Sequence, residues 1–356
     1  MSPEPSPLLS ARVLAVRLGA IGDVANALVF ATALRDAAPE LHLAWVVHPL
    51  AEPLVRDHPA VDRVHVWRRG TGLRGLRSLA AELRRARYDL AVDLQRIAKS
   101  ALVARLSGAP RVLGADRART KELSWLLTRE RLPPGDPGAH VTALYLEFAR
   151  YLGARAAEPR HVLPRDPAAE AWAEALVAEL GGPPVLVNLG ATKPANRWAP
   201  ERFGRVAAAL RAAPGLPVCL TGGPDDEGRA RAALAAAGPG SGVRDLVGRT
   251  SLRQLVALLA RAALFLGCDT GPMHLAAACR TPVVALFGPA DPRRTGPWQP
   301  PGAALHRVLQ VPPPCAPCGR RRCNQPRHAC MEDLEPELVL EAARAHLESV
   351  GHAARP

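Results

Sequence analysis

Long apolar runs, lysines and aromatic side chains are all scarce in this 356-residue chain, and these shortages argue against particular classes of protein. No stretch of about 18 or more residues is continuously apolar, so the sequence predicts no transmembrane helix. The first ten residues are rich in Pro and Ser and lack the basic start of a secretory signal. These features predict a cytoplasmic protein.

Lysine supplies only three of the 46 basic side chains, yet the formal net charge is +13. Basic residues concentrate between Arg63 and Arg131, where 17 Lys and Arg outnumber 6 Asp and Glu. The positive electrostatic field of such a region favours binding of nucleic acid, an anionic membrane or an acidic substrate. Aromatic residues make up 4% of the chain and do not alternate with the basic run, which argues against binding of RNA or single-stranded DNA.

Cysteine is present in an odd number, seven, and five of the cysteines lie beyond residue 270, which does not suit a disulfide framework. Cys315, Cys318, Cys323 and Cys330 follow the spacing C-x2-C-x4-C-x6-C. Four such thiols could hold Zn²⁺ or an iron–sulfur cluster, but only the first pair has the usual metal-binding spacing. The sequence leaves metal binding open and favours packed or redox-labile thiols, so no metal or cofactor is included in the predicted site.

Apolar runs alternate with helical patterns in both halves of the chain, which predicts parallel sheets covered by helices. The expected strands are 12–17, 43–47, 64–67, 90–93, 111–113, 185–189, 217–220, 263–266 and 283–287. The expected helices are 24–37, 73–87, 140–151, 200–212, 227–237, 252–262, 274–279 and 335–347. A Pro- and Ala-rich stretch at 158–168 is the expected linker between the halves.

We therefore predict an α/β protein with two Rossmann-like domains, at residues 1–160 and 169–330, facing a central cleft. The closing segment at 331–356 is expected to contribute a helix that packs back on the first domain.

In the second half, a polar turn joins a buried strand to a small-residue helix over the segment Cys268-Asp269-Thr270-Gly271-Pro272-Met273-His274-Leu275. Thr270 or Asp269 is expected to cap the helix, whose free N–H groups and dipole then form an anion site. Asp269 can bind hydroxyls and His274 can donate to a phosphate. The segment therefore suits a sugar phosphate or nucleotide sugar, with an ordinary strand-to-helix turn as the competing interpretation.

Near the N-terminus, the turn Arg17-Leu18-Gly19-Ala20-Ile21-Gly22-Asp23-Val24 follows the first expected strand. Two glycines let the backbone turn tightly, but their spacing is not the dinucleotide fingerprint. On local chemistry alone, Asp23 is interpreted as the cap of the following helix.

Together these motifs resemble the heptosyltransferases of glycosyltransferase family 9. The resemblance extends from Arg12 to Glu332 and rests on the two turns above, on Asp93-Leu94-Gln95 and on Thr-Pro-Val-Val-Ala-Leu-Phe-Gly-Pro at 281–289. It implies the GT-B fold and an inverting transferase that moves a heptose from ADP-heptose to the inner core of lipopolysaccharide. The implied partners are an ADP-sugar and the lipopolysaccharide acceptor at the inner face of the inner membrane, without nucleic acid and without a required divalent ion.

The same resemblance assigns roles to individual residues. Asp23 is expected to be the catalytic base that takes the proton of an acceptor hydroxyl. The acceptor is expected to meet the basic side chains Arg96, Lys99, Arg119 and Lys121. The donor is expected to be bound by Thr192, Lys193, Arg197, Asp226, Glu227, Asp269, Thr270, Gly271 and His274.

Two of these donor assignments stay open. The commonest form of the family's diphosphate loop carries Lys two places before the Trp, where this chain has Asn196, so Lys193 or Arg197 would supply the charge. Either Asp226 or Glu227 would bind the ribose. Other functions also remain open: another nucleotide-sugar transferase of the family, a non-hydrolysing nucleotide-sugar epimerase, or a nucleic-acid-binding protein that uses the basic window.

Overall fold

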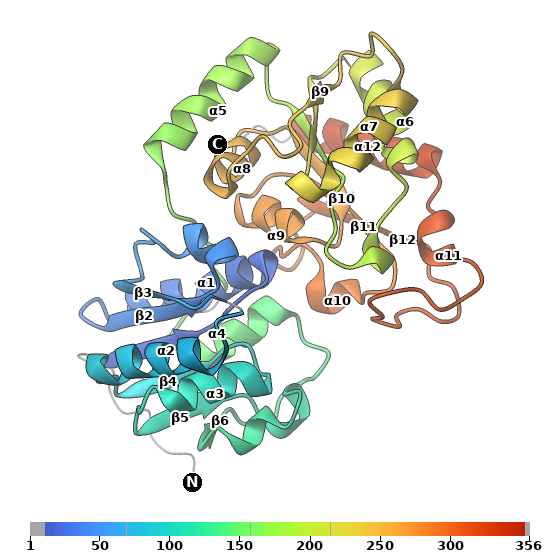
Figure 1. The fold of residues 1–356 in the computed structure, drawn as a ribbon. Helices are drawn as coiled ribbons and strands as arrows, with labels where there is room; N and C mark the ends of the chain where they lie inside the picture. The colour runs from blue at the N-terminus through green and yellow to red at the C-terminus, as the bar shows by residue number, and fades with distance from the viewer. Residues whose placement is uncertain (1–10, 69, 157, 214, 353–356) are drawn as a thin grey trace. The chain divides into compact units, whose positions relative to one another are not determined.

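The computed structural model describes residues 11–68, 70–156, 158–213 and 215–352; the Pro/Ser-rich first ten residues and the end of the closing segment lie outside them. The chain divides into two compact units, the first ending at Pro164 and the second starting at Arg165. Each unit contains a six-stranded sheet (Figure 1).

The first unit has strand order β3-β2-β1-β4-β5-β6, with every pair parallel. Its strands are β1 (Arg12–Val16), β2 (His42–Val47), β3 (Arg63–Val66), β4 (Leu90–Asp93), β5 (Arg111–Gly114) and β6 (Glu130–Arg131). Its helices are α1 (Ile21–Ala37), α2 (Gly72–Ala86), α3 (Ala98–Leu106) and α4 (Val141–Tyr151), with short 3-10 helices η1 (Pro49–Leu54), η2 (Arg117–Arg119) and η3 (Ser124–Leu126).

Helices cover both faces of this sheet, which explains why its central strands are apolar throughout. Leu14 and Val16 of β1 pack with Leu79 and Leu83 of α2 in one buried cluster. Alternate residues of β1 point to the opposite face, where α1 packs against α4 (Figure 1).

The second unit repeats this order, since β12-β11-β10-β7-β8-β9 has the same pattern when counted from β7. Its strands are β7 (Val185–Asn188), β8 (Val218–Thr221), β9 (Arg244–Asp245), β10 (Leu264–Cys268), β11 (Val283–Phe287) and β12 (His306–Gln310). Its longer helices are α5 (Pro167–Leu180), α6 (Pro200–Ala212), α7 (Glu227–Ala237), α8 (Leu252–Leu259), α9 (Gly271–Ala278) and α12 (Pro336–His352). Its short helices are α10 (Pro292–Thr295), α11 (Ala329–Glu332), η4 (Pro194–Asn196) and η5 (Pro224–Asp226).

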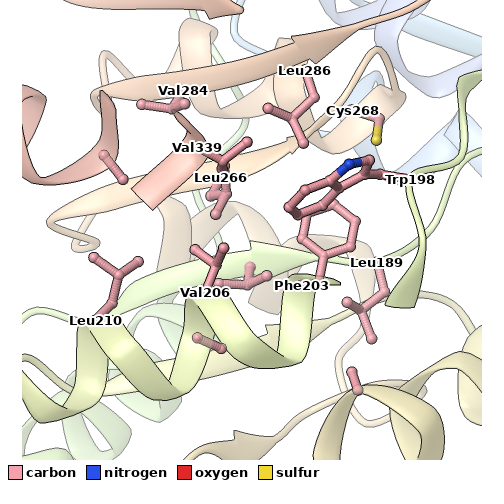
Figure 2. Close-up of a cluster of buried hydrophobic side chains, with 14 of the residues drawn as sticks. Leu189, Trp198, Phe203, Val206, Leu210, Leu266, Cys268, Val284, Leu286 and Val339 are labelled. Carbon is pink, nitrogen blue, oxygen red and sulfur yellow. The ribbon is translucent and has the colours of Figure 1, made fainter. Parts of the chain in front are cut away.

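The core of the second unit is built around Trp198 and Phe203, which precede and begin the buried face of α6 (Figure 2). Their rings meet edge to face, with centroids 4.7 Å apart and planes at 88°. Trp198 Nε1 donates to the Leu334 carbonyl at 2.8 Å, so this large side chain is buried without losing its hydrogen bond. The ring pair fixes the end of the loop that follows β7.

The predicted α/β class with two Rossmann-like sheets is confirmed, and the order of both sheets is the doubly wound one. Helix α5 was not predicted, although its start carries clear signals: the Asp166 carboxylate accepts the Ala169 N–H at 3.0 Å and Pro167 occupies the first turn. The end of the expected linker therefore belongs to a helix.

The closing helix, expected to pack on the first domain, has extensive contacts with the second unit. Helix α12 packs against α6, β11 and β12 of the second unit. Its Val339, Ala342 and Ala343 join the buried cluster around Trp198, and Arg344 donates to the Ala209 carbonyl at 3.2 Å. The apolar stripe of this helix therefore completes the core of the sheet that it follows.

Candidate functional site

The turn after β1 carries a close ion pair at the centre of the first sheet. Strands β1 and β4 are neighbours, and ligands of doubly wound sheets bind where the strand order reverses between such strands. Asp23 lies in the first turn of α1, with its Oδ2 2.5 Å from Nη2 of Arg17. The Asp23 side chain is 43% exposed, whereas that of Arg17 is 6% exposed. A buried cation therefore holds a carboxylate that still reaches solvent.

Asp23 is not the cap of helix α1, because Ala20 occupies the N-cap position and no side chain caps the helix there. Its buried partner Arg17 lies with Cζ 5.9 Å from the centroid of the Tyr145 ring. Burial acts to lower the pKa of Arg17, but Asp23, Tyr145 and Asp93 outweigh it, and the pKa is raised. Arg17 therefore remains positively charged beside Asp23.

Asp93 ends β4 and lies next to Val16 in the sheet register. Its Oδ1 accepts the N–H groups of Gln95 at 3.1 Å and Arg96 at 3.0 Å. Burial raises the pKa of Asp93 to about 6, and hydrogen bonds to the charged form offset this only in part. The neighbouring Gln95 Oε1 accepts the Leu18 N–H at 2.8 Å, which ties the turn after β4 to the turn after β1.

The basic side chains expected to meet the acceptor fall into two groups. Lys99 and Lys121 are exposed. Nζ of Lys99 lies 4.4 Å from the centroid of the Trp67 ring. The backbone N–H of Lys121 donates to the Arg96 carbonyl at 2.9 Å. Arg96 is partly buried, and its Nη1 donates to the Arg119 carbonyl at 2.9 Å. The two lysines therefore present their charge to solvent.

Arg119 is the buried member of the four basic residues expected to meet the acceptor. Its side chain is 2% exposed and forms ion pairs with Asp116 and, at 2.5 Å, with Glu147. Its Nη2 also donates to the Pro133 carbonyl at 2.9 Å. The charge of Arg119 is therefore balanced by two carboxylates of its own unit. Its contacts stabilise the irregular segment after β5.

In the second unit, β7 and β10 are the neighbouring strands at the reversal of strand order. The loop after β7 exposes Thr192 and Lys193. Arg197 is also exposed, but its Nε donates to the Ala191 carbonyl at 2.9 Å. Lys193 is thus the better placed of the two candidate cations to meet a ligand, since Arg197 holds the loop itself.

Asn196 takes the position where the family's commonest loop has lysine, and it joins this loop to the turn after β10. Its Nδ2 donates to both the carbonyl and the Oδ2 of Asp269 at 3.0 Å. His274 Nε2 lies 4.0 Å from the other oxygen of Asp269. Asn196 and His274 are buried, so the Asp269 carboxylate is held in one orientation.

Helix α9 begins at Gly271, directly after the end of β10. Thr270 is the N-cap residue, but its side chain makes no capping hydrogen bond, so the expected Thr270 cap is wrong. Pro272 in the first turn has no N–H to satisfy. The positive end of the helix dipole therefore lies at the end of β10.

The two acidic residues after β8 that were expected to bind the donor differ in exposure. Asp226 is buried, its Oδ2 accepts the Gly223 N–H at 3.0 Å, and a side chain on Gly190 would collide with it. Glu227 is exposed at the start of α7. Asp226 therefore lies between the turns after β7 and β8, whereas Glu227 is open to solvent.

Sequence reasoning missed Arg229, which organises the same loop from α7. Its Nε donates to the Leu189 carbonyl at 2.9 Å and its Nη2 to the Trp198 carbonyl at 2.6 Å, so one guanidinium holds both ends of the segment between them. No local pattern signals this role, because an arginine on an Ala-rich helix looks like a solvated charge.

Two general properties complete the description. Within the described ranges, no three His, Cys, Asp or Glu side chains are grouped closely enough to hold a metal ion as they stand. None of the helices described above has the length and apolarity to cross a membrane.

Comparison with known proteins points to one family. The family model of glycosyltransferase family 9 (heptosyltransferase) matches residues 76–328. Lipopolysaccharide heptosyltransferase 1 of Pseudomonas aeruginosa is 32% identical over 329 residues, which cover 88% of this chain and 87% of that protein.

Solved structures agree in fold. A family 9 glycosyltransferase from Veillonella parvula superposes with a TM-score of 0.83 at 21% identity, covering 96% of this chain and 98% of the other. The E. coli heptosyltransferase WaaC with ADP gives a TM-score of 0.73 at 23% identity, covering 94% and 99%.

Proposed function

Because the chain belongs to glycosyltransferase family 9, we propose that it moves a heptose from ADP-heptose to the inner core of lipopolysaccharide. Membership makes the chain a glycosyltransferase enzyme. The specific donor and acceptor are supported by relatives whose names state a lipopolysaccharide heptosyltransferase activity.

One observation carries the mechanism: the half-exposed Asp23 carboxylate beside a buried, charged Arg17 at the end of β1. A general base must be reachable by substrate and fixed in direction. The 2.5 Å contact with Arg17 limits rotation of the carboxylate, which is 43% exposed. Asp23 is the acidic side chain at this turn that meets both demands.

In the proposed step, an acceptor hydroxyl gives its proton to Asp23 as its oxygen attacks the anomeric carbon of the heptose. The bond from that carbon to the diphosphate oxygen breaks on the opposite face, and ADP leaves with the electron pair. Attack from the face opposite to the leaving group inverts the anomeric configuration. The charge that grows on the leaving phosphate needs donors already in place.

The second unit supplies those donors in this proposal. The Gly271 N–H and the dipole of α9 meet the diphosphate, and Lys193 adds a positive charge from the loop after β7. Asp269, fixed by Asn196, binds sugar hydroxyls, with His274 and Thr192 beside the phosphates.

The ribose contact in this proposal comes from Glu227, whose carboxylate is exposed, while the buried Asp226 shapes the loop.

The first unit supplies the acceptor contacts in this proposal. Lys99 and Lys121 present exposed ammonium groups that suit the carboxylates and phosphates of an anionic core saccharide. Arg96 adds a partly buried guanidinium. With such an acceptor, the protein would associate peripherally with the inner face of the inner membrane.

Product analysis tests the proposal directly. The full chain is incubated with ADP-heptose, with and without a core-deficient lipopolysaccharide acceptor, and products are resolved by chromatography and mass spectrometry. We expect ADP release and a heptose added to the acceptor only when both substrates are present. An epimer of the donor formed without acceptor would instead establish the epimerase, and transfer from a UDP- or GDP-sugar alone would establish a different donor.

A further inference from the structure

The segment between β12 and α11, residues 311–328, contains no helix or strand, and together with α11 it brings four of the seven cysteines around one cavity. The cavity measures about 530 Å³ and is lined by Cys315, Cys318, Cys323 and Cys330 together with His328. The remaining three cysteines, Cys219, Cys268 and Cys279, lie elsewhere and do not line it. The transferase chemistry proposed above uses none of the four cavity thiols.

None of these four thiols forms a disulfide. Cys330 is buried on α11, while Cys315, Cys318 and Cys323 are exposed on the irregular segment. All four line the same cavity, so one cation placed there could be reached by every one of them.

We propose that Cys315, Cys318, Cys323 and Cys330 bind one thiophilic divalent ion, Zn²⁺ or Fe²⁺, in a tetrahedral four-sulfur site. Four thiolate ligands satisfy the coordination of either ion, and a closed set without a water position is typical of structural sites. Binding forms four metal–sulfur bonds and releases four thiol protons, with no change of oxidation state.

The ion must draw the ligands together, because no three of them stand within coordination range in the described part of the chain. One ligand is fixed: Cys330 is buried on α11, and its sulfur and the neighbouring Met331 pack closely against Gly288. The other three thiols lie on a segment without regular secondary structure, which can close by small changes of many backbone angles. Cys330 therefore acts as the anchor and the segment closes onto it.

The same segment contacts the loop after β7, which belongs to the second unit's site, and the turn after β11. The Arg321 carbonyl accepts the Ala195 N–H at 3.2 Å, next to Asn196 on the loop after β7. The Gly319 N–H donates to the Pro289 carbonyl at 2.7 Å, on the turn after β11. A metal that orders residues 315–330 would therefore fasten the loop that carries Thr192 and Lys193.

Metal analysis of the full chain tests the site. The protein is purified under reducing, oxygen-free conditions by a tag that binds no metal, reconstituted with Zn²⁺ or Fe²⁺, and freed of excess ion. We expect roughly one tightly held ion per chain by plasma mass spectrometry. Co²⁺ substitution should give the thiolate-to-metal absorption of a tetrahedral sulfur site.

Matched variants assign the ligands. Cys315→Ala and Cys318→Ala, both at exposed positions, should lower metal content at least about tenfold while far-ultraviolet circular dichroism stays unchanged. Cys219→Ala, Cys279→Ala and His328→Ala should retain the ion. Protein that holds no ion after reconstitution with either metal, or that loses it equally in the Cys219→Ala control, would overturn the site. Disulfides found by mass spectrometry in place of a metal would overturn it as well.

The link to the donor loop rests on the proposed function and has its own readout. Removal of the ion should raise the Kd for ADP about threefold to tenfold by calorimetry, through the loop contacts of Ala195 and Pro289. An unchanged Kd would remove this link while leaving the metal stoichiometry to decide the site itself.

Discussion

The two units share one strand order but place opposite chemistry at its point of reversal. In the first unit, the turn after β1 holds a charged pair, in which buried Arg17 contacts half-exposed Asp23, with buried Asp93 at the end of β4. In the second unit, the corresponding turns hold a neutral amide, Asn196, hydrogen-bonded to Asp269, and the start of helix α9.

This difference shows what topology decides and what it leaves to side chains. The doubly wound order fixes where a crevice forms, because the turns after adjacent central strands lead to opposite faces of the sheet. The residue types in those turns then decide between proton transfer and anion binding. A cation beneath a carboxylate favours the first, and free N–H groups beside hydrogen-bonded side chains favour the second.

The largest test of this division is Asp23→Asn, which keeps the shape of the side chain but removes the base. We expect kcat to fall by roughly 10²- to 10⁴-fold, as typical for loss of general base catalysis, while the Kd for ADP stays within about twofold. Asp36→Asn is the matched control, since Asp36 lies near the other end of α1 in an exposed ion pair with Arg160. A variant that kept more than a few per cent of wild-type kcat would exclude Asp23 as the base.

The second unit should respond in binding rather than in the chemical step. Asp269→Ala releases Asn196 and removes a hydroxyl acceptor, and His274→Ala removes its neighbour, so each should raise the Kd for ADP-heptose about 10- to 30-fold. Calorimetry with ADP and with the intact donor separates phosphate from sugar contacts. His346→Gln is the control, because His346 is a buried histidine of the same unit hydrogen-bonded to Leu305. Unchanged affinity for both ligands would place the donor site elsewhere.

Much of this contrast could be predicted from the sequence, because both turns follow apolar strands and carry their polar residues in a contiguous motif. The strand at 90–93 and the helices at 200–212 and 227–237 have the predicted bounds. What the sequence could not show are partnerships between distant residues. Arg119 pairs with Glu147, 28 positions away, and Asn196 pairs with Asp269, 73 positions away. Because such partners lie far apart in the sequence, the sequence alone does not distinguish a buried, paired side chain from an exposed one.

For two helices, the sequence contained a helix signal that its amino-acid composition made hard to interpret. Helix α5 begins with a capping Asp166 and Pro167, but its Pro- and Ala-rich start suggested a linker. The closing helix carries an apolar stripe that could cover either sheet, and only the packing of Val339 and Ala343 beside Trp198 shows which one it covers.

A stability measurement sharpens the comparison at Asp93. Its pKa of about 6 in the folded chain lies above its ordinary value of 3.8, so the folded state keeps a proton that the unfolded chain has released. The free energy of unfolding should therefore fall as the pH rises from about 4 to about 6, and stay lower above that window. Asp93→Asn removes this penalty and should raise the free energy of unfolding by about 1–2 kcal/mol at pH 8, with little gain at pH 4.

Denaturant titrations at the two pH values measure this effect. Asp89→Asn, an exposed acid just before the same strand, should leave the pH dependence as it is. An Asp93→Asn variant with equal gains at both pH values would mean that its effect is packing and not ionisation.

The smallest expected effect concerns the exposed lysines of the first unit. Removing both charges in Lys99→Gln/Lys121→Gln should raise the KM for the acceptor about fivefold, because charge-assisted contacts at exposed positions are weakened by solvent and salt. The Kd for ADP should change by less than about twofold, since both lysines lie in the first unit. Arg74→Gln/Arg77→Gln, which removes two exposed charges from α2, controls for the general basic field. If both double variants raised the acceptor KM equally, the field as a whole would attract the acceptor; if neither did, the basic window would have no part in acceptor recognition.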